Sequence, residues 1–177
     1  MLTFSDKNGS LYCVRGLDES HIEQWYAELK NLSPGFTIYS RYPVLKSDLF
    51  DIISSQSKIN IWLAVHELQS DDYIGNIHVG PIDYLNSVTY FGRTLFNQYR
   101  SKGIGTAMTK FIISYCFDHL NIRKVKAGAF SENKGSMISN ERAGMILEYT
   151  EPKSTLIQGK YMDTCVFTIY NPNFEKF

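Results

Sequence analysis

The chain lacks the features that mark membrane, secreted and nucleic-acid-binding proteins. No apolar run in its 177 residues approaches the length needed to span a bilayer. Lysine plus arginine number 18 and aspartate plus glutamate also number 18, so the basic excess of a generic nucleic-acid binder is missing. Asp6 and Lys7 interrupt the N-terminal region, so we expect no secretory leader. These absences predict a cytoplasmic protein with no nucleic-acid partner and no membrane partner.

Cysteine is scarce, and the few cysteines present form no disulfide pattern. Cys13, Cys116 and Cys165 lie far apart and are odd in number, which predicts reduced, mostly buried thiols in a cytoplasmic protein. Histidine gives no metal motif either. His66-Glu67 lacks the second histidine of a zinc-protease helix because position 70 is Ser70. We therefore predict no bound metal.

The chain also has no internal repeat, low-complexity segment or linker, so residues 1–177 are predicted to form a single domain. Its 44% of hydrophobic residues suffices for one core. Hydrophobic periodicity predicts strands at 11–15, 59–68, 73–79, 88–96, 124–130, 146–151 and 161–170, and helices at 22–29, 48–54, 104–119 and 135–143. This order predicts an α/β (α+β) fold, with a mixed central sheet of about seven strands and helices on both faces.

Local signals predict how these elements begin and end. Ser20 and Glu23 have the spacing of a capping box before the first helix. Ser47 is expected to cap the short second helix. Gly80-Pro81 begins a stretch to Asn86 that we expect to be a loop.

The most informative segment runs from Arg100 to Thr106 and joins a predicted strand to a predicted helix. A glycine turn at a helix start directs backbone N–H groups at one point, and the helix dipole favours negative charge there. This arrangement binds phosphate. It is not the dinucleotide fingerprint, because Met108 stands at the third glycine, nor a P-loop, because Ile104 follows Gly103. A tight turn that needs glycine only for its conformation explains the hexapeptide equally well.

Taken together with three other segments, this loop resembles the GNAT superfamily of acetyl-CoA-dependent N-acetyltransferases. Arg100, Gly103 and Gly105 are similar to the pyrophosphate motif of that family. Asn133 and Ser136 begin a stretch that is similar to its second motif. The further segments that carry the resemblance are Ile74-Gly75-Asn76-Ile77 and Tyr90-Phe91-Gly92, similar to two strands, Ala143-Gly144-Met145, where phenylalanine is usual in place of Met145, and Gly159-Lys160-Tyr161-Met162-Asp163, similar to a closing motif of the branch that acetylates ribosomal-protein N-termini, polyamines and amino sugars.

The resemblance implies that acetyl-CoA is the cofactor and that a free amine attacks its thioester carbonyl. Backbone N–H groups of the glycine loop would bind the pyrophosphate, and the pantetheine arm would lie along residues 88–96. Family members have a bulge there that separates two strands, and an unpaired N–H at Thr94 or Leu95 would polarise the carbonyl. The implied cofactor-binding residues are Thr94, Leu95, Phe96, Arg100, Ser101, Lys102, Gly103, Ile104, Gly105, Thr106 and Asn133.

For proton transfer the resemblance implies several candidates. Many relatives place a tyrosine acid seven residues after the motif asparagine, but that position is Asn140 here. Ser136 is the acid implied by the branch named above, and a helix-capping or packing role is its alternative. His78 and Glu132 are the two candidate bases, each with an ordinary surface or core role as its alternative. A water chain is the third route for the proton.

The acceptor pocket is expected between the first helices, residues 32–44 and residues 80–86. The absence of a strong acidic cluster favours a small polar amine, such as an amino sugar or its nucleotide, over a polycation such as spermidine. Three alternatives stay open: an acyl-CoA-binding module without turnover, an enzyme acting on a protein N-terminus, and a protein for an unrelated phosphate ligand. Homodimers are frequent in such families, so a second copy of the chain is a candidate partner. The candidate acceptor-binding residues are Tyr39, Arg41, Tyr42, His78, Tyr84 and Tyr161.

Overall fold

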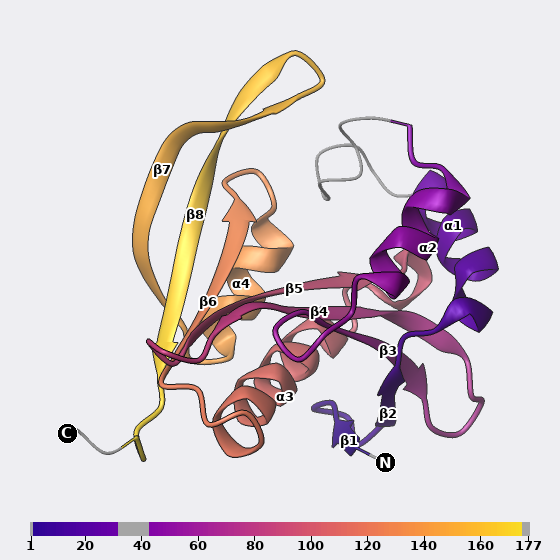
Figure 1. Ribbon diagram of the computed structural model, residues 1–177, viewed down its shortest axis with the longest axis horizontal. Coiled ribbons are helices and arrows are strands. Elements are labelled where there is room, and N and C mark those ends of the chain that lie inside the picture. Colours follow the sequence, from indigo (N-terminus) through magenta and orange to yellow (C-terminus); the bar gives the residue numbers. More distant parts are fainter. Residues whose placement is uncertain (1, 32–42, 175–177) are drawn as a thin grey trace.

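The computed structural model describes residues 2–31 and 43–174. Within these residues the chain forms one mixed sheet of eight strands with helices on both faces (Figure 1). The strand order is β1-β2-β3-β4-β5-β6-β8-β7, and every neighbouring pair is antiparallel except β5 and β6, which are parallel. No helix in this part of the chain is long and apolar enough to cross a membrane.

The predicted α/β class and the helices on both faces are confirmed, with one strand more than expected. The strands are β1 (Leu2–Ser5), β2 (Leu11–Gly16), β3 (Ile61–Glu67), β4 (Tyr73–Asp83), β5 (Val88–Leu95), β6 (Lys124–Phe130), β7 (Ile146–Ile157) and β8 (Lys160–Tyr170). The helices are α1 (Ile22–Asn31), α2 (Lys46–Ser54), α3 (Ile104–Asp118) and α4 (Lys134–Arg142), with short 3-10 turns η1 (Glu19–His21) and η3 (Asn97–Tyr99).

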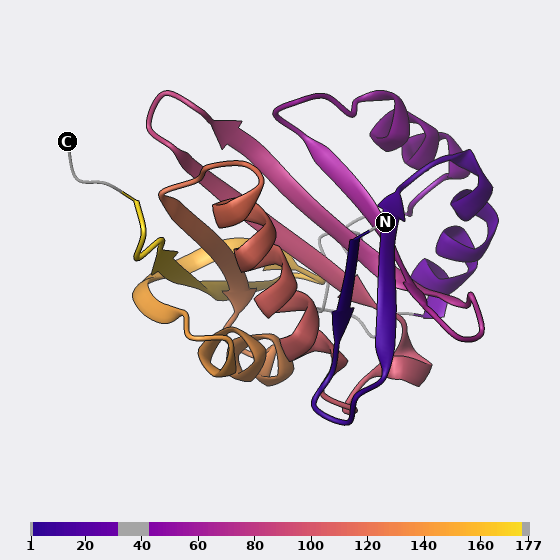
Figure 2. The same ribbon diagram turned by 90° about the horizontal axis from the view of Figure 1, so that it is seen from below.

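Two buried clusters, one on each face of the sheet, hold these layers together. Helices α3 and α4 lie on one face (Figure 2), where Met108 of α3 shares a cluster with Ile77 of β4. Helices α1 and α2 lie on the other face, where Trp25 and Leu49 share a cluster with Phe96. Burial of this apolar surface is the main favourable contribution to folding. Three free cysteines, all buried, lie within these layers: Cys13, Cys116 and Cys165.

The structure corrects the predicted strands in number and in extent. The strand predicted at 11–15 is confirmed as β2, but β1 before it was not predicted; Phe4 of β1 stacks on Tyr12 of β2 with ring centroids 5.1 Å apart. The strand predicted at 146–151 is too short, because β7 continues to Ile157. The expected loop at Gly80 is wrong, because β4 continues through it to Asp83 after a register shift. Ile82 stays in the sheet region because its N–H donates to the carbonyl of Ile59 at 2.9 Å.

The predicted helix caps were displaced by neighbouring acidic residues. Asp18, rather than Ser20, caps the first turn: its side chain accepts from the N–H of Ser20. At α2 the carboxylate of Asp48 accepts from the N–H of Leu45 at 2.8 Å, so Ser47 is not the cap. In both cases a carboxylate near a helix start is favoured by the helix dipole.

The sheet opens where β5 and β6 stop pairing. Their parallel register ends at Phe91 and Ala127. Beyond it β5 continues to Leu95 beside β4, whereas β6 continues to Phe130 beside β8. Strands β6, β7 and β8 therefore turn away from β4 and β5 (Figure 1). The strands separate where the resemblance implied, but the register shift against β4 lies after Val79 rather than near the end of β5.

Candidate functional site

The glycine loop forms a tight turn that ends at the start of α3. Gly103 is the residue before the helix, with φ of +89°, and Ser101 has φ of +62°. The N–H of Arg100 donates to the carbonyl of Asn97, and the N–H of Thr106 donates to the carbonyl of Gly103. The amides of residues 101–105 lie between these two, at the positions that no intrahelical carbonyl can reach. The expected cradle is thus one residue shorter than predicted, because the Arg100 amide is already bonded.

A cavity of about 400 Å³ lies beside this loop, between the end of β5, the start of α3 and α4. It brings together most of the residues that the sequence singled out for the cofactor, including the two from the second motif. It is lined by Arg93, Thr94, Leu95, Arg100, Ser101, Gly103, Gly105, Thr106, Asn133, Gly135, Ser136, Ile138, Ser139 and Arg142.

One wall of the cavity is the open edge of β5. The N–H of Phe96 donates to the carbonyl of Ile74 at 2.9 Å, and such positions recur at every second residue of an antiparallel pair. The N–H of Thr94 is therefore directed to β4, and the peptide groups of Leu95 are directed to the open side. In agreement, Nε of Arg100 donates to the carbonyl of Leu95 at 2.9 Å. Of the two amides considered for polarising a carbonyl, that of Leu95 faces the opening.

The opposite wall is the first turn of α4. Asn133 caps this helix, since its side-chain oxygen accepts from the N–H of Ser136 at 3.0 Å. Only the backbone N–H of Ser136 takes part in that cap, so its hydroxyl is not needed to begin the helix. Ser139, one turn later, donates from its hydroxyl to the carbonyl of Gly135 at 2.8 Å.

The floor of the cavity carries a cation, the side chain of Arg93 from β5. Its guanidinium donates to Oδ1 of Asn140 at 3.0 Å and to the carbonyl of Ser136 at 3.4 Å. Burial lowers the pKa of Arg93 from 12.5 to about 10, so it stays protonated at neutral pH. Asn140, at the position of the usual tyrosine acid, is completely buried. It therefore orients Arg93 rather than facing the cavity.

Three residues predicted for the cofactor, and the candidate base Glu132, do not line the cavity. Phe96 and Ile104 are buried in the two core clusters. The side chain of Lys102 lies over the ring of Tyr99 and lines a separate hollow against the β1–β2 turn. Glu132 is exposed and pairs with Lys160, with Nζ to Oε1 at 2.6 Å. Each has a structural role that the spacing of the motifs could not reveal.

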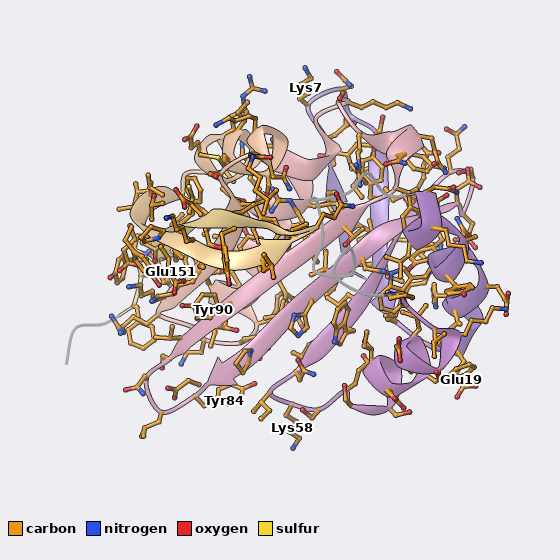
Figure 3. All side chains as sticks on the ribbon, turned by 90° about the horizontal axis from the view of Figure 1, so that it is seen from above. Lys7, Glu19, Lys58, Tyr84, Tyr90 and Glu151 are labelled. Atoms are coloured by element: carbon orange, nitrogen blue, oxygen red, sulfur yellow. The ribbon has the colours of Figure 1, made fainter. Side chains whose placement is uncertain are left out.

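The candidate acceptor residues are dispersed. Tyr84 is exposed at the start of the β4–β5 turn, where Figure 3 shows it beside Lys58, to whose carbonyl its hydroxyl donates at 3.0 Å. Tyr161 is 61% exposed at the start of β8. Neither lines the cavity. The remaining three tyrosine and arginine candidates lie outside the described residues: Tyr39, Arg41 and Tyr42.

His78 lies on β4, on the face of the sheet opposite α3. Its ring stacks on Trp62 at 4.4 Å between centroids, and its Nε2 lies 2.5 Å from Oδ1 of Asn60. Burial lowers the pKa of His78 below 6.5, so the ring is neutral at neutral pH. Its register partner on β5 is Gly92, three residues before Leu95, which places it about 10 Å along the strand from the cavity wall.

The sequence reasoning missed Arg93 and the second turn of α4. Two signals were available. Arg93 is two residues before Leu95, so it shares a face of β5 with it. Ser139 and Asn140 are three and four residues after Ser136, so they share a face of the helix with it.

A family model described as an acetyltransferase (GNAT) domain matches residues 13–146. Two curated relatives from Bacillus subtilis (strain 168) match part of the chain. "Probable N-acetyltransferase YjcK" is 32% identical over 87 residues, which are 49% of this chain and 48% of that protein. "Putative ribosomal N-acetyltransferase YdaF" is 25% identical over 101 residues, which are 57% of this chain and 55% of that protein. The chain spans about half the length of the curated relatives that it matches.

The fold is also similar to solved structures. One is the spermidine N-acetyltransferase from Vibrio cholerae in complex with CoA and spermine. The TM-score is 0.82 at 17% sequence identity, over 92% of this chain and 97% of that chain. At this identity the likeness establishes the arrangement of helices and strands, and nothing about the acceptor.

Proposed function

The chain belongs to the acetyltransferase (GNAT) family, and on that premise we propose that it transfers the acetyl group of acetyl-CoA to a primary amine of a small polar acceptor, such as an amino sugar or sugar nucleotide. One observation carries the proposal: the open end of β5 and the glycine loop that follows it line a single cavity with the start of α4, a segment distant in the chain. The proposal is further supported by a similar fold in a protein whose solved structure contains CoA.

The residues of the cavity fit acetyl-CoA. Its diphosphate would be held by the amides of residues 101–105, which lie at a helix N-terminus, where negative charge is favoured. The pantetheine arm would lie along the open edge of β5 and near Asn133. When bound, the cofactor supplies the activated acetyl group.

Two groups are placed to act on the reacting atoms. The amide of Leu95 faces the opening, and it would stabilise negative charge that develops on the thioester oxygen. Ser136 lines the same cavity, and its hydroxyl would give a proton to the departing thiolate. Asn140 stands at the usual position of the tyrosine acid, but it is buried and bonded to Arg93. It is therefore not an alternative to Ser136 as the proton donor.

The acceptor amine must reach Leu95 in its unprotonated form. His78 is neutral at neutral pH, and its Nε2–H is directed to Asn60 Oδ1, so Nδ1 is the nitrogen that can accept a proton. Its distance along the strand from Leu95 requires an intervening water. Glu132 is a weaker candidate because its carboxylate is engaged by Lys160.

The choice of acceptor rests on different support. The relatives include one described as a ribosomal N-acetyltransferase, which favours a protein N-terminus as the second candidate acceptor. We place a small polar amine first because the described wall of the cavity and the neighbouring face of β4 present hydroxyl, amide and imidazole groups rather than clustered carboxylates. The homodimer suggested by the resemblance stays a prediction, to be tested by light scattering.

Thiol release from acetyl-CoA, measured against a panel of amino sugars, polyamines and peptide N-termini, tests the proposal. We expect release to depend on an amine from the first class and the protein to gain thermal stability with CoA. Binding of CoA without release for any amine would instead support the module without turnover. Stabilisation by another phosphate ligand but not by CoA would support the unrelated binding protein.

A further inference from the structure

A half-buried guanidinium, that of Arg93, lines the cavity without an acidic partner. Among the described residues, the ion pairs involve other cations, and the two groups that accept from Arg93 are neutral: Oδ1 of Asn140 and the carbonyl of Ser136. Phe91 lies on the same face, with its ring centroid 5.9 Å from Cζ. A partly desolvated charge without a counter-charge is unfavourable, so an anion bound in the cavity would stabilise it.

The position of this charge is set by a side chain that is itself incompletely bonded. Asn140 is completely buried, and its Nδ2 has no hydrogen-bond partner among the described residues. An unsatisfied buried amide group costs stability, and leucine would fill such a place without that cost. What Asn140 provides instead is Oδ1, 3.0 Å from Nη1 of Arg93. The pair therefore fixes a cation rather than neutralising it.

Arg93 lies directly beneath the phosphate-binding turn. A Cβ atom built on Gly105, in the first turn of α3, would lie 4.0 Å from Nε of Arg93 and 3.3 Å from Oγ of Ser139. The guanidinium thus approaches the helix start from the side of the sheet. Both Arg93 and Gly105 line the same cavity.

We propose that Arg93, oriented by Asn140, is a side-chain ligand for the diphosphate of CoA. The amides of residues 101–105 bind this group from the loop, and the guanidinium binds it from the sheet. A planar guanidinium suits a diphosphate because it donates two parallel hydrogen bonds to neighbouring oxygens. The inference rests on the proposed function, since it takes CoA as the ligand. Asn140 acts as a positioning residue for Arg93. At the position where many relatives have a tyrosine acid, this chain would thus have a residue that helps to hold the cofactor.

Calorimetric titration with three ligands tests this assignment: CoA, dephospho-CoA, which keeps the diphosphate, and acetyl-pantetheine, which has no phosphate. For Arg93→Met we expect CoA and dephospho-CoA to bind about 10- to 100-fold more weakly, the range typical of lost hydrogen bonds to a charged group. Acetyl-pantetheine should bind as it does to the unaltered protein. The CoA affinity of Arg93→Lys should lie between those of the unaltered protein and Arg93→Met, because lysine keeps the charge but cannot donate two parallel hydrogen bonds.

Asn140→Asp distinguishes charge from packing. The substitution keeps the shape and the acceptor for Arg93, but it neutralises the cation. A purely structural role predicts unchanged CoA affinity, whereas the proposal predicts a loss of about tenfold or more without a lower melting temperature. Arg123→Met serves as the matched control, since Arg123 lies over the ring of Tyr170, outside the cavity, and should leave CoA affinity unchanged.

Three results would overturn the proposal. Arg93→Met and Asn140→Asp could both bind CoA as the unaltered protein does, or the loss could appear with CoA but not with dephospho-CoA, which would assign the guanidinium to the 3′-phosphate. An equal loss for acetyl-pantetheine would indicate a general distortion of the cavity. If Arg93→Met does not fold, Asn140→Asp and Arg93→Lys decide. Absence of CoA binding by the unaltered protein would instead contradict the proposed function.

Discussion

Nε of Arg100 donates a hydrogen bond to the carbonyl oxygen of Leu95 at 2.9 Å. This contact joins the glycine loop to the open end of β5, across a chain separation of five residues. The carbonyl and the N–H of Leu95 belong to successive peptide groups, and both are directed to the open side of β5. If CoA binds as proposed, Arg100 therefore links the part of the site for the diphosphate to the part for the thioester.

Arg100→Ala should weaken both ends of the site together. The substitution removes a hydrogen bond from a charged donor, for which about 1.5–3 kcal/mol is typical, so we expect kcat/KM for acetyl-CoA to fall about 10- to 100-fold. Steady-state kinetics with varied acetyl-CoA checks this. Lys102→Ala is the control, because Lys102 points to Tyr99 and lines the other hollow. Equal effects of the two substitutions would show that the loop needs only positive charge.

Alanine substitutions at Gly103 and at Gly105 should affect the protein for different reasons. Gly103 has φ of +89°, a conformation that costs about 1–2 kcal/mol for other residues, so Gly103→Ala should lower the melting temperature and weaken CoA binding. The added Cβ would point to the side chain of Lys7 at 3.5 Å, so strain rather than blocked phosphate space is the cause. Gly105→Ala has no such strain, but its Cβ would press on Ser139 at 3.3 Å.

Thermal unfolding and CoA titration of both variants separate these causes. We expect Gly103→Ala to lose more stability than Gly105→Ala, and Gly105→Ala to lose CoA affinity with the smaller change in stability. A Gly105→Ala variant that binds CoA normally would show that Ser139 of α4 can move to accommodate the added Cβ. In that case the wall between α3 and α4 is less rigid than the contacts indicate.

The sequence was most informative where the signal is local. The turn from Arg100 to Thr106, the helix after it and the Asn133–Ser136 spacing depend on neighbours a few residues apart. The structure confirms the turn and the helix, and it brings Asn133 and Ser136 to the same cavity as the turn. The resemblance added the separation of β5 from β6. Local propensity also misled: Ser20 is a good capping residue, but Asp18 takes the position.

The rest of the site depends on contacts between segments distant in the chain. Arg93 and Asn140 are 47 residues apart, and nothing local in either segment indicates their hydrogen bond. Glu132 and Lys160 are 28 residues apart, and their ion pair makes Glu132 a weaker candidate base. The direction of the backbone N–H groups at the end of β5, as for Thr94 and Leu95, likewise depends on the register with β4.

Substitutions of Asn133 and Ser136 should have different effects, the first on the stability of the protein and the second on kcat. Asn133→Ala removes the cap of α4 and should cost about 1 kcal/mol of stability, visible in urea unfolding. Ser136→Ala keeps the backbone cap and should leave stability nearly unchanged. If the Ser136 hydroxyl protonates the thiolate, kcat should fall by about 100-fold or more, since general acids typically contribute that much. Unchanged kcat in Ser136→Ala would return Ser136 to a packing role and leave the proton to water.

His78 should make the stability of the protein depend on pH in the acidic range. Burial lowers the pKa of His78 below the 6.5 of an exposed imidazole, so the unfolded chain binds a proton at a higher pH than the folded protein does. Between the lowered pKa and 6.5 the unfolded state carries more protons, and the free energy of unfolding therefore falls as the pH decreases through this window. Above 6.5 the group is neutral in both states and contributes no pH dependence.

His78→Gln tests both roles of this side chain. Glutamine can still donate to Asn60 but does not titrate, so the difference in unfolding free energy between the two proteins should shrink as the pH falls from about 7.5 to about 5. If His78 accepts the amine proton, the acidic limb of the kcat/KM profile, where activity rises with pH, lies below 6.5 in the unaltered protein and is lost in the variant. A limb above that value that is retained in His78→Gln belongs to the amine itself. The acceptor then arrives already deprotonated, and His78 serves only to pack against Trp62.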